Sequence, residues 1–290
     1  MKKLKYAVLS DIHSNDVALE ACMENIRKEN PDGVLLLGDY VSDCPDPQST
    51  LALLRKLIKE YPAVVLRGNR EEYFIQYKEA PTEVWDCSSY KGSLLYTFER
   101  LKDEDIAWFK TLPDSVVFAP KGAEPITIAH GSPLSNRELL DIDRDNTKAA
   151  LENLTTKWLI CGHTHRQGVY LYKGHVVLNP GSLGVAIGDI KKAHMAYIEW
   201  DGAKWSYRFC AIPFDYERLK MKFEKSRLMQ MAKLWPVCIM QSMLCGENVG
   251  PLCAKRAYDL SKADGVEITH HKVPEKYWEI AAREMGISVE

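Results

Sequence analysis

Two histidines one residue apart, His163 and His165, follow a short apolar segment that ends at Cys161. This segment is typical of a buried strand, and the Gly-His-Thr-His stretch after it begins a loop. Imidazole nitrogens are common ligands of divalent metal ions. An isolated pair of histidines is also common in proteins that bind no metal, so this pair by itself does not predict a metal site.

Metal-ligand side chains follow other short apolar segments as well. Asp11 and His13 come after residues 6–10, Asp39 after 33–37, Asn69 after 63–66, and His130 after 126–129. Each has a plain alternative, as a loop acid, a turn asparagine or a buried, hydrogen-bonded histidine. Together with the first pair they provide carboxylate, amide and imidazole ligands, which suit manganese, iron, zinc, cobalt or nickel. Seven ligands are too many for one ion and about right for two ions that share a carboxylate.

The elements around these residues alternate between buried strands and helices. A helix is predicted to begin at Asn15 or Asp16 and to end before Pro31, and a second one to span residues 51–60. This alternation predicts a sheet rich in parallel strands, whose ligand sites lie beyond the carboxyl ends of the strands. We therefore expect the seven side chains to lie close together at the carboxyl ends of the strands.

The remaining sequence predicts further packing elements. Residues 71–112 are mainly helical, and hairpins are expected around Lys173-Gly174 and Asp201-Gly202. After Pro213 the pattern indicates helices only, with starts near Pro236, Pro251 and Pro274. We divide the chain into a domain of residues 1–212 and a helical extension of residues 213–290. The extension could serve as a packing layer, a lid or a dimer interface.

Composition places the chain among ordinary globular proteins. Hydrophobic residues make up 46% and charged residues 27%, with a formal net charge of −2, which gives no strong nucleic-acid signal. We expect neither a signal peptide nor a membrane span, because no apolar run approaches the roughly 18 residues that a span needs. The eight cysteines are scattered and form no C-x-x-C pair, so we expect reduced thiols and a cytoplasmic location.

Taken together and in this order, the motifs Asp11-x-His13, Gly38-Asp39, Gly68-Asn69, His130-Gly131 and Gly162-His163-x-His165 resemble those of the calcineurin-like metallophosphoesterase superfamily. The resemblance covers about residues 4–212 and is closest to the small bacterial phosphodiesterase-like branch. It implies an α/β fold, a four-layer sandwich of two mixed β-sheets flanked by helices.

The resemblance also implies a role for each motif residue. Asp11, His13 and His165 would hold the first metal ion, Asn69, His130 and His163 the second, and Asp39 would bridge both. Asp39, Asn69, Arg70 and His130 are the implied catalytic residues. The reaction would be hydrolysis of a phosphodiester or phosphoanhydride bond by a hydroxide that bridges two divalent ions, manganese being the first choice. The partner would be a small, nucleotide-like phosphorylated substrate.

Arg70 departs from the family pattern, since many members carry a histidine that is thought to protonate the leaving group at this position. A guanidinium stays charged at any working pH, so it can bind a phosphate but cannot deliver a proton. We therefore predict a preference for leaving groups that depart unprotonated. The alternative is that Arg70 is a loop residue paired with Glu71 or Glu72.

Two other functions are compatible with the same motifs. A phosphomonoesterase or protein phosphatase would differ only in substrate. A non-catalytic scaffold is the alternative from another class, because the fold also occurs in a retromer subunit that has lost histidine ligands. No ligand is missing here, which favours an enzyme. A homo-oligomer is compatible with the apolar tail.

Overall fold

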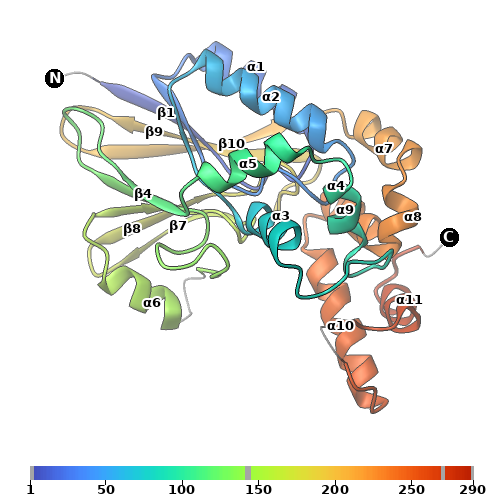
Figure 1. Ribbon diagram of the computed structural model, residues 1–290. Helices are drawn as coiled ribbons and strands as arrows, with labels where there is room; N and C mark the ends of the chain where they lie inside the picture. Colours follow the sequence, from blue (N-terminus) through green and yellow to red (C-terminus); the bar gives the residue numbers. More distant parts are fainter. Residues whose placement is uncertain (1–2, 141–144, 269–271, 289–290) are drawn as a thin grey trace.

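Two five-stranded mixed sheets form the centre of the molecule (Figure 1). The computed structural model describes residues 3–140, 145–268 and 272–288. The first sheet has the order β10-β9-β1-β2-β3, with β1 at Leu4–Leu9, β2 at Gly33–Leu36, β3 at Ala63–Val65, β9 at Lys192–Trp200 and β10 at Trp205–Pro213. The second has the order β4-β5-β6-β8-β7, with β4 at Ser115–Phe118, β5 at Ile126–Ala129, β6 at Trp158–Ile160, β7 at Gln167–Tyr172 and β8 at His175–Pro180.

Parallel strands lie side by side in each sheet. In the first sheet β1, β2 and the edge strand β3 run parallel, with the antiparallel strands β9 and β10 on the other side of β1. In the second sheet β5, β6 and β8 run parallel in the middle, and the antiparallel strands β4 and β7 form the edges. Both predicted hairpins are present, as β7–β8 and β9–β10. The carboxyl ends of the parallel strands therefore lie together at one end of each sheet, where the loops that follow them can meet.

Helices cover the outer face of each sheet and complete the four layers (Figure 1). On the first sheet lie α1 at Asp16–Glu29 and α2 at Pro47–Glu60, continued by α3 at Asn69–Glu79, α4 at Gly92–Phe98 and α5 at Asp103–Thr111. On the second lies α6 at Asp145–Glu152. The fold class predicted from the sequence is confirmed.

Successive side chains of the central strands point to opposite faces of the sheet and so pack into two different parts of the core. Val8 and Leu35 point toward the second sheet and pack with Ile160, whereas Leu9 and Leu36 point to the opposite face and pack against α1 and α2. Both faces of the central strands are thus buried. That burial explains why these strands are continuous apolar runs rather than alternating ones.

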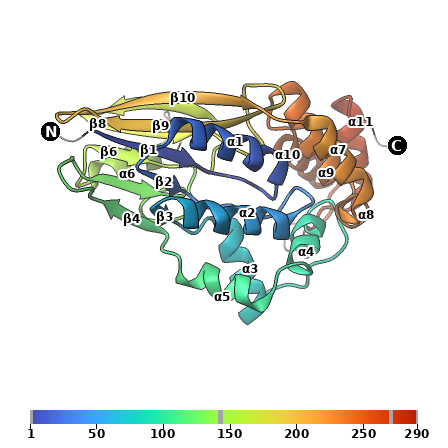
Figure 2. The ribbon, with the colours of Figure 1, turned by 90° about the horizontal axis from the view of Figure 1, so that it is seen from above.

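The C-terminal extension lies at one end of the sandwich, opposite the N-terminus (Figure 2). It consists of α7 at Tyr216–Lys225, α8 at Leu228–Ala232, α9 at Leu234–Cys245, α10 at Val249–Ala263 and α11 at Glu275–Glu284. Helices α9 and α10 begin two residues before Pro236 and Pro251, not at them. Both prolines lie in the first turn, where a missing N–H removes no intrahelical hydrogen bond.

No helix within the described ranges is long and apolar enough to cross a membrane. All eight cysteines are free thiols, and six of them are buried among apolar neighbours. Most of the cysteines therefore pack as small hydrophobic residues.

Candidate metal centre

All seven predicted ligands lie in loops that leave the carboxyl ends of strands, or begin the next helix. Asp11 and His13 follow β1, Asp39 follows β2, Asn69 begins α3, His130 follows β5, and His163 and His165 follow β6. The loops come from both sheets. They bring together ligand atoms that are up to 154 positions apart in the sequence.

Two groups of three ligands form where these loops meet. Asp11, His13 and His165 offer one atom each within 4.8 Å of one another, and Asp39, His130 and His163 do the same. In the first group His165 Nε2 is 3.4 Å from Asp11 Oδ1 and 3.0 Å from His13 Nε2. Asn69 adds to the second group, since its Oδ1 is 3.1 Å from His130 Nε2.

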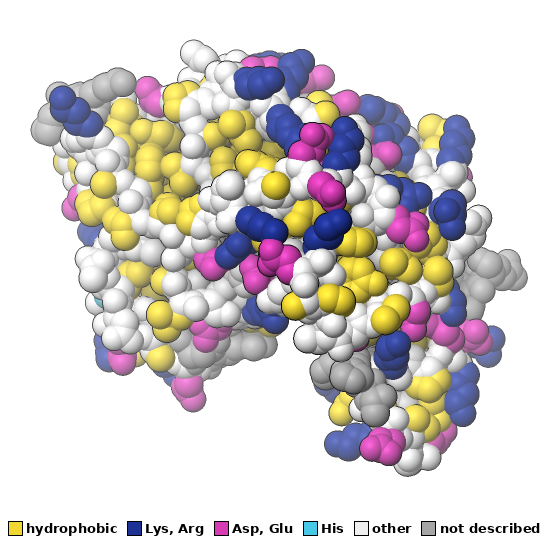
Figure 3. Space-filling view, in the orientation of Figure 1, with side chains coloured by type: hydrophobic (Ala, Val, Ile, Leu, Met, Phe, Trp, Pro, Cys, Tyr) yellow, Lys and Arg dark blue, Asp and Glu magenta, His cyan; other side chains and the backbone are white. Residues whose placement is uncertain are grey.

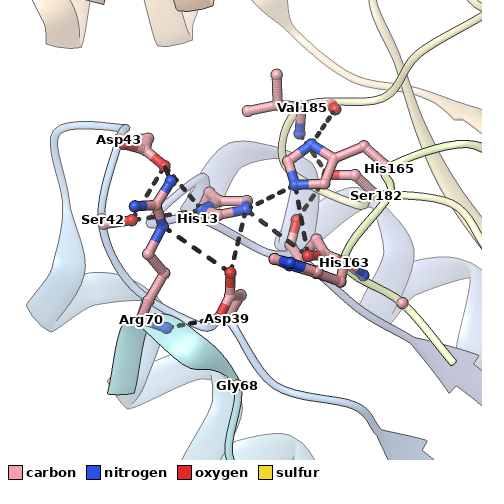
Figure 4. Close-up of polar contacts among 12 residues, drawn as sticks. His13, Asp39, Ser42, Asp43, Gly68, Arg70, His163, His165, Ser182 and Val185 are labelled. Carbon is pink, nitrogen blue, oxygen red and sulfur yellow. Dashed lines mark hydrogen bonds and ion pairs between the residues drawn. The ribbon is translucent and has the colours of Figure 1, made fainter. Parts of the chain in front are cut away.

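Asp39 lies between the two groups. Its Oδ1 is 3.5 Å from His130 Nε2. Its Oδ2 is 3.8 Å from His13 Nε2 (Figure 4). Each carboxylate oxygen therefore faces a different group. This arrangement suits a carboxylate that is shared by two ions.

Hydrogen bonds at the other ring nitrogen orient three of the histidines. The Nδ1 of His165 is 3.0 Å from the carbonyl of Val185, and the Nδ1 of His130 is 2.9 Å from that of Leu37. The Nδ1 of His13 is 3.0 Å from a carboxylate oxygen of Asp43. Because these partners can only accept, each Nδ1 carries the hydrogen and each Nε2 presents a lone pair to the site.

The chemistry of this donor set fits a cation. Asp11 Oδ2 accepts the backbone N–H of His163 at 3.0 Å, but within the described residues its buried Oδ1 has no hydrogen-bond partner. An unpaired, buried carboxylate oxygen is costly, and so are Nε2 lone pairs that face each other. A divalent ion among Asp11, His13 and His165 satisfies all three groups.

The electrostatics favour the metal-binding form of Asp11 and His163, whereas burial lowers the pKa of His165 but the Asp11 carboxylate outweighs it and raises that pKa. Burial raises the pKa of Asp11, but the imidazoles of His165, His130 and His13 outweigh it and hold the pKa of this carboxyl well below its usual range. Burial, reinforced by His130, lowers the pKa of His163 to about 4. The carboxylate is therefore ionised and this imidazole neutral at pH 7, as metal binding requires.

Backbone strain is concentrated in the ligand loops. Asp11, His13, Asp39, His163 and His165 all have positive φ values, between 50° and 67°. Side chains other than glycine seldom adopt this left-handed conformation, which costs about 1–3 kcal/mol per residue. The surrounding structure must impose it, and such strain is typical of functional sites.

Arg70 points into the site rather than toward its neighbours in sequence. Its Nη2 is 3.1 Å from Asp43 Oδ2, and its Nε is 3.9 Å from Asp39 Oδ2 (Figure 4). The alternative that Arg70 pairs with Glu71 or Glu72 is wrong. Glu71 accepts the backbone N–H groups of Gly68, Asp39 and Tyr40, and Glu72 pairs with Arg67 at 3.1 Å.

Sequence reasoning missed two buried acids at the site, Glu71 and Asp43. Glu71 fixes the loops of Asp39 and Gly68, and burial together with Asp39 raises its pKa to about 7. Its signal was present, since a glutamate at the third helical position is a capping residue. Asp43 lies in an Asp-rich loop and had no distinguishing pattern.

Gly162 must be glycine for the two sheets to meet. A Cβ there would overlap Ser10 Oγ and lie 2.7 Å from Asp11 Oδ2, and both residues are buried.

Gly162→Ala should weaken manganese binding about tenfold, because the loop of His163 and His165 must shift. It should also lower the free energy of unfolding by about 1–3 kcal/mol. Calorimetric titration and thermal unfolding measure the two effects. Gly168→Ala is the control, since its Cβ would meet nothing within 4 Å, and equal losses in both variants would contradict this account.

Comparisons with known proteins show which family and which folds this chain is similar to. The family model described as calcineurin-like phosphoesterase matches residues 4–167. An uncharacterized protein of Methanocaldococcus jannaschii is 25% identical over 250 residues, which are 79% of this chain and 95% of that protein.

Two solved structures share the fold over most of the chain. A hypothetical protein of Pyrococcus horikoshii superposes with a TM-score of 0.68 and 21% identity, covering 84% of this chain and 98% of its own. A metallophosphoesterase of Sphaerobacter thermophilus gives a TM-score of 0.61 and 20% identity, covering 77% of this chain and 94% of its own.

Proposed function

Because the chain belongs to the calcineurin-like phosphoesterase family, we propose that it is a dinuclear-metal-dependent hydrolase of phosphodiester or phosphoanhydride bonds. The observation that carries the proposal is the pair of three-ligand groups with one oxygen of Asp39 facing each. A complete ligand set on both sides of a shared carboxylate favours an enzyme over a scaffold.

The chain's own residues would hold the ions and orient the substrate. Asp11, His13 and His165 would bind one ion, Asn69, His130 and His163 the other, and Asp39 both. When bound, two divalent ions would activate a water molecule and neutralise charge on the phosphoryl group. The mixture of oxygen and nitrogen ligands suits manganese, and also iron, zinc, cobalt or nickel.

Arg70 supports a preference for particular leaving groups. Its side chain is 22% exposed and lies between Asp39 and Asp43, at the border of the ligand groups. Burial lowers its pKa, but the two carboxylates outweigh burial and raise it, so the guanidinium keeps its proton. A group that binds phosphoryl oxygens without giving up a proton favours aryl and nucleotide leaving groups, which depart unprotonated.

A cavity along α3 supports nucleotide-like substrates. It has a volume of about 530 Å³, and Tyr73, Tyr77, Trp85 and Arg137 contribute to its lining. The rings of Tyr77 and Trp85 stack at 3.8 Å, and the guanidinium of Arg137 lies 4.8 Å from the ring centre of Tyr73. Tyr73 belongs to α3, the helix that begins with the predicted ligand Asn69. Aromatic and guanidinium planes in a cavity along this helix suit a nucleobase.

Charge distribution and thiol chemistry bear on partners and location. On the face shown in Figure 3, lysine and arginine side chains are interspersed with aspartate and glutamate, which fits a small substrate better than a nucleic acid. The free cysteines support a reducing compartment such as the cytoplasm.

A substrate panel with manganese tests the proposal. Bis-p-nitrophenyl phosphate and dinucleoside polyphosphates should be hydrolysed faster than a simple alkyl monophosphate. Faster turnover of aryl monoesters and phosphopeptides than of every diester and anhydride would instead support the phosphomonoesterase alternative. No hydrolysis of any member, with metal bound, would favour a scaffold.

Arg70→Ala should lower kcat/KM for bis-p-nitrophenyl phosphate by about a hundredfold, because one charged group facing the phosphoryl oxygens is lost. The content of bound manganese should stay at two ions per chain, since Arg70 is not a ligand. Arg67→Ala is the matched control, because this arginine pairs with Glu72 and Asp114 instead. A wild-type rate in the Arg70 variant would show that the guanidinium does not contact substrate.

A further inference from the structure

Asp43 joins the candidate metal centre to the rest of the molecule. It lies four residues after Asp39, in the loop between β2 and α2, and is buried. Its Oδ2 is 3.0 Å from His13 Nδ1 and 3.1 Å from Arg70 Nη2 (Figure 4). One carboxylate oxygen thus contacts both a predicted metal ligand and the arginine that faces the site.

The other oxygen of Asp43 is held by donors from outside the strand-end loops. Its Oδ1 accepts from the indole N–H of Trp235 at 2.7 Å and from Ser93 Oγ at 3.2 Å. Ser93 belongs to α4, whereas Trp235 belongs to α9 of the C-terminal extension. The extension therefore supplies the shorter of the two bonds to Asp43, across 192 positions of sequence.

The loop that carries Asp43 depends on such support. Ser42 and Asp43 have φ values of 96° and 66°, a conformation that residues other than glycine keep only where their surroundings impose it. Within the loop, Ser42 Oγ donates to Asp43 Oδ2 at 3.0 Å, whereas both donors to Oδ1 come from helices α4 and α9. A charge-assisted bond from the partly buried indole of Trp235 adds to the preference for this side-chain orientation.

Close packing fixes the position of Trp235 relative to α4. A Cβ on Gly92 of α4 would overlap the carbonyl oxygen of Met231 in α8, so these two backbones are in direct contact. The backbone N–H of Leu234 also donates to Ser89 Oγ at 3.1 Å, just before α4. These contacts hold the start of α9, which carries Trp235, against α4, which carries Ser93.

We propose that the C-terminal helical extension completes the metal centre through Trp235, which fixes Asp43 so that Asp43 orients His13 for metal binding and Arg70 for substrate. Trp235 and Asp43 are positioning residues in this arrangement. A carboxylate on Nδ1 holds the ring in place and makes Nε2 a stronger ligand. The inference rests on the dinuclear centre proposed above.

Manganese binding to the full-length chain tests the proposal. Trp235→Phe keeps an aromatic ring and removes only the N–H donor, and Asp43→Asn keeps the shape and removes the charge. We expect Trp235→Phe to weaken one of the two manganese equivalents about tenfold in calorimetric titration, and Asp43→Asn about 10–100-fold. Both should also lower kcat for bis-p-nitrophenyl phosphate at saturating manganese, since Arg70 loses its orientation.

Two further variants distinguish a role of Trp235 through Asp43 from a general destabilisation of the fold. They are the double variant that combines Trp235→Phe with Asp43→Asn, and the control Trp278→Phe. If Trp235 acts through Asp43, the double variant should bind manganese no more weakly than Asp43→Asn alone. Trp278→Phe makes the same change in α11 of the extension. Trp278 is more deeply buried than Trp235, and its indole N–H has no hydrogen-bond partner among the described residues. This variant should keep wild-type affinity for manganese.

Three results would each overturn the proposal. They are wild-type affinity for manganese in Trp235→Phe, an equal loss of affinity in Trp278→Phe, and additive losses of affinity in the double variant. If Trp235→Phe fails to fold by circular dichroism, Ser93→Ala removes the other donor to Oδ1 and must weaken the same equivalent by a smaller factor. A wild-type chain that binds no manganese would instead overturn the metal centre itself, and the positioning role with it.

Discussion

Asp39→Asn should lower the turnover of bis-p-nitrophenyl phosphate by about a thousandfold, an effect at the upper end of those seen when one electrostatic contact to a transition state is removed. The variant should also retain at most one manganese ion per chain. Asp39 is the only predicted ligand that faces both groups, with Oδ1 3.5 Å from His130 Nε2 and Oδ2 3.8 Å from His13 Nε2. An asparagine has one oxygen and no charge, so it cannot serve two ions.

Metal content by atomic emission and steady-state kinetics measure the two effects on the same preparation. Asp46→Asn is the matched control, because it makes the same change in the same loop, where Asp46 contacts Lys222 at 2.9 Å rather than the site. Its rate should stay within about twofold of wild type. Two bound ions and a normal rate in Asp39→Asn would show that Asp39 is not a bridge.

Manganese should stabilise the folded chain strongly. A ligand at about 100 times its Kd adds about 2.7 kcal/mol to the free energy of unfolding for each site. For a chain of this size that corresponds to an increase in Tm of about 5 °C per site. The physical reason lies in the first ligand group. Binding a cation there relieves the buried, unpartnered Oδ1 of Asp11 and the Nε2 atoms of His13 and His165, which lie 3.0 Å apart.

Thermal unfolding with added manganese, and then with excess EDTA, measures this coupling. Chelation should return Tm to its lower value and reduce hydrolysis to background. Asp39→Asn should show a smaller increase in Tm than wild type, while Asp46→Asn should show the full increase. An equal Tm of the wild type in manganese and in EDTA would contradict binding to the folded state.

The strand pattern made the ligand loops predictable. Each strand that precedes a ligand is a short, mostly apolar run, and every residue of β2, β5 and β6 is buried in the sandwich. The change from apolar to polar residues therefore marks the carboxyl end of the strand to within one residue at β1, β2, β3, β5 and β6. Parallel pairing then requires these ends to lie together.

Partners of the loop side chains could not be predicted in the same way. The alternative in which Arg70 pairs with the next residues in sequence is wrong, because Glu71 turns back to cap three backbone N–H groups and Glu72 pairs with Arg67. The real partner of Arg70, Asp43, is 27 positions away. A helix start offers several possible ion pairs, and only the packing of neighbouring loops selects among them.

The sequence by itself determined the alternation of strands and helices and the set of seven candidate ligands. A buried strand is recognisable from its own apolar residues, and the ligands follow the ends of such strands. The division of these ligands into two groups followed only from the family resemblance, and the tertiary structure brings Asp11 and His165 together from different sheets. The tertiary structure also decided that a tryptophan of the extension supports the site. Contacts between distant segments depend on how sheets and helices pack, and no local pattern encodes that packing.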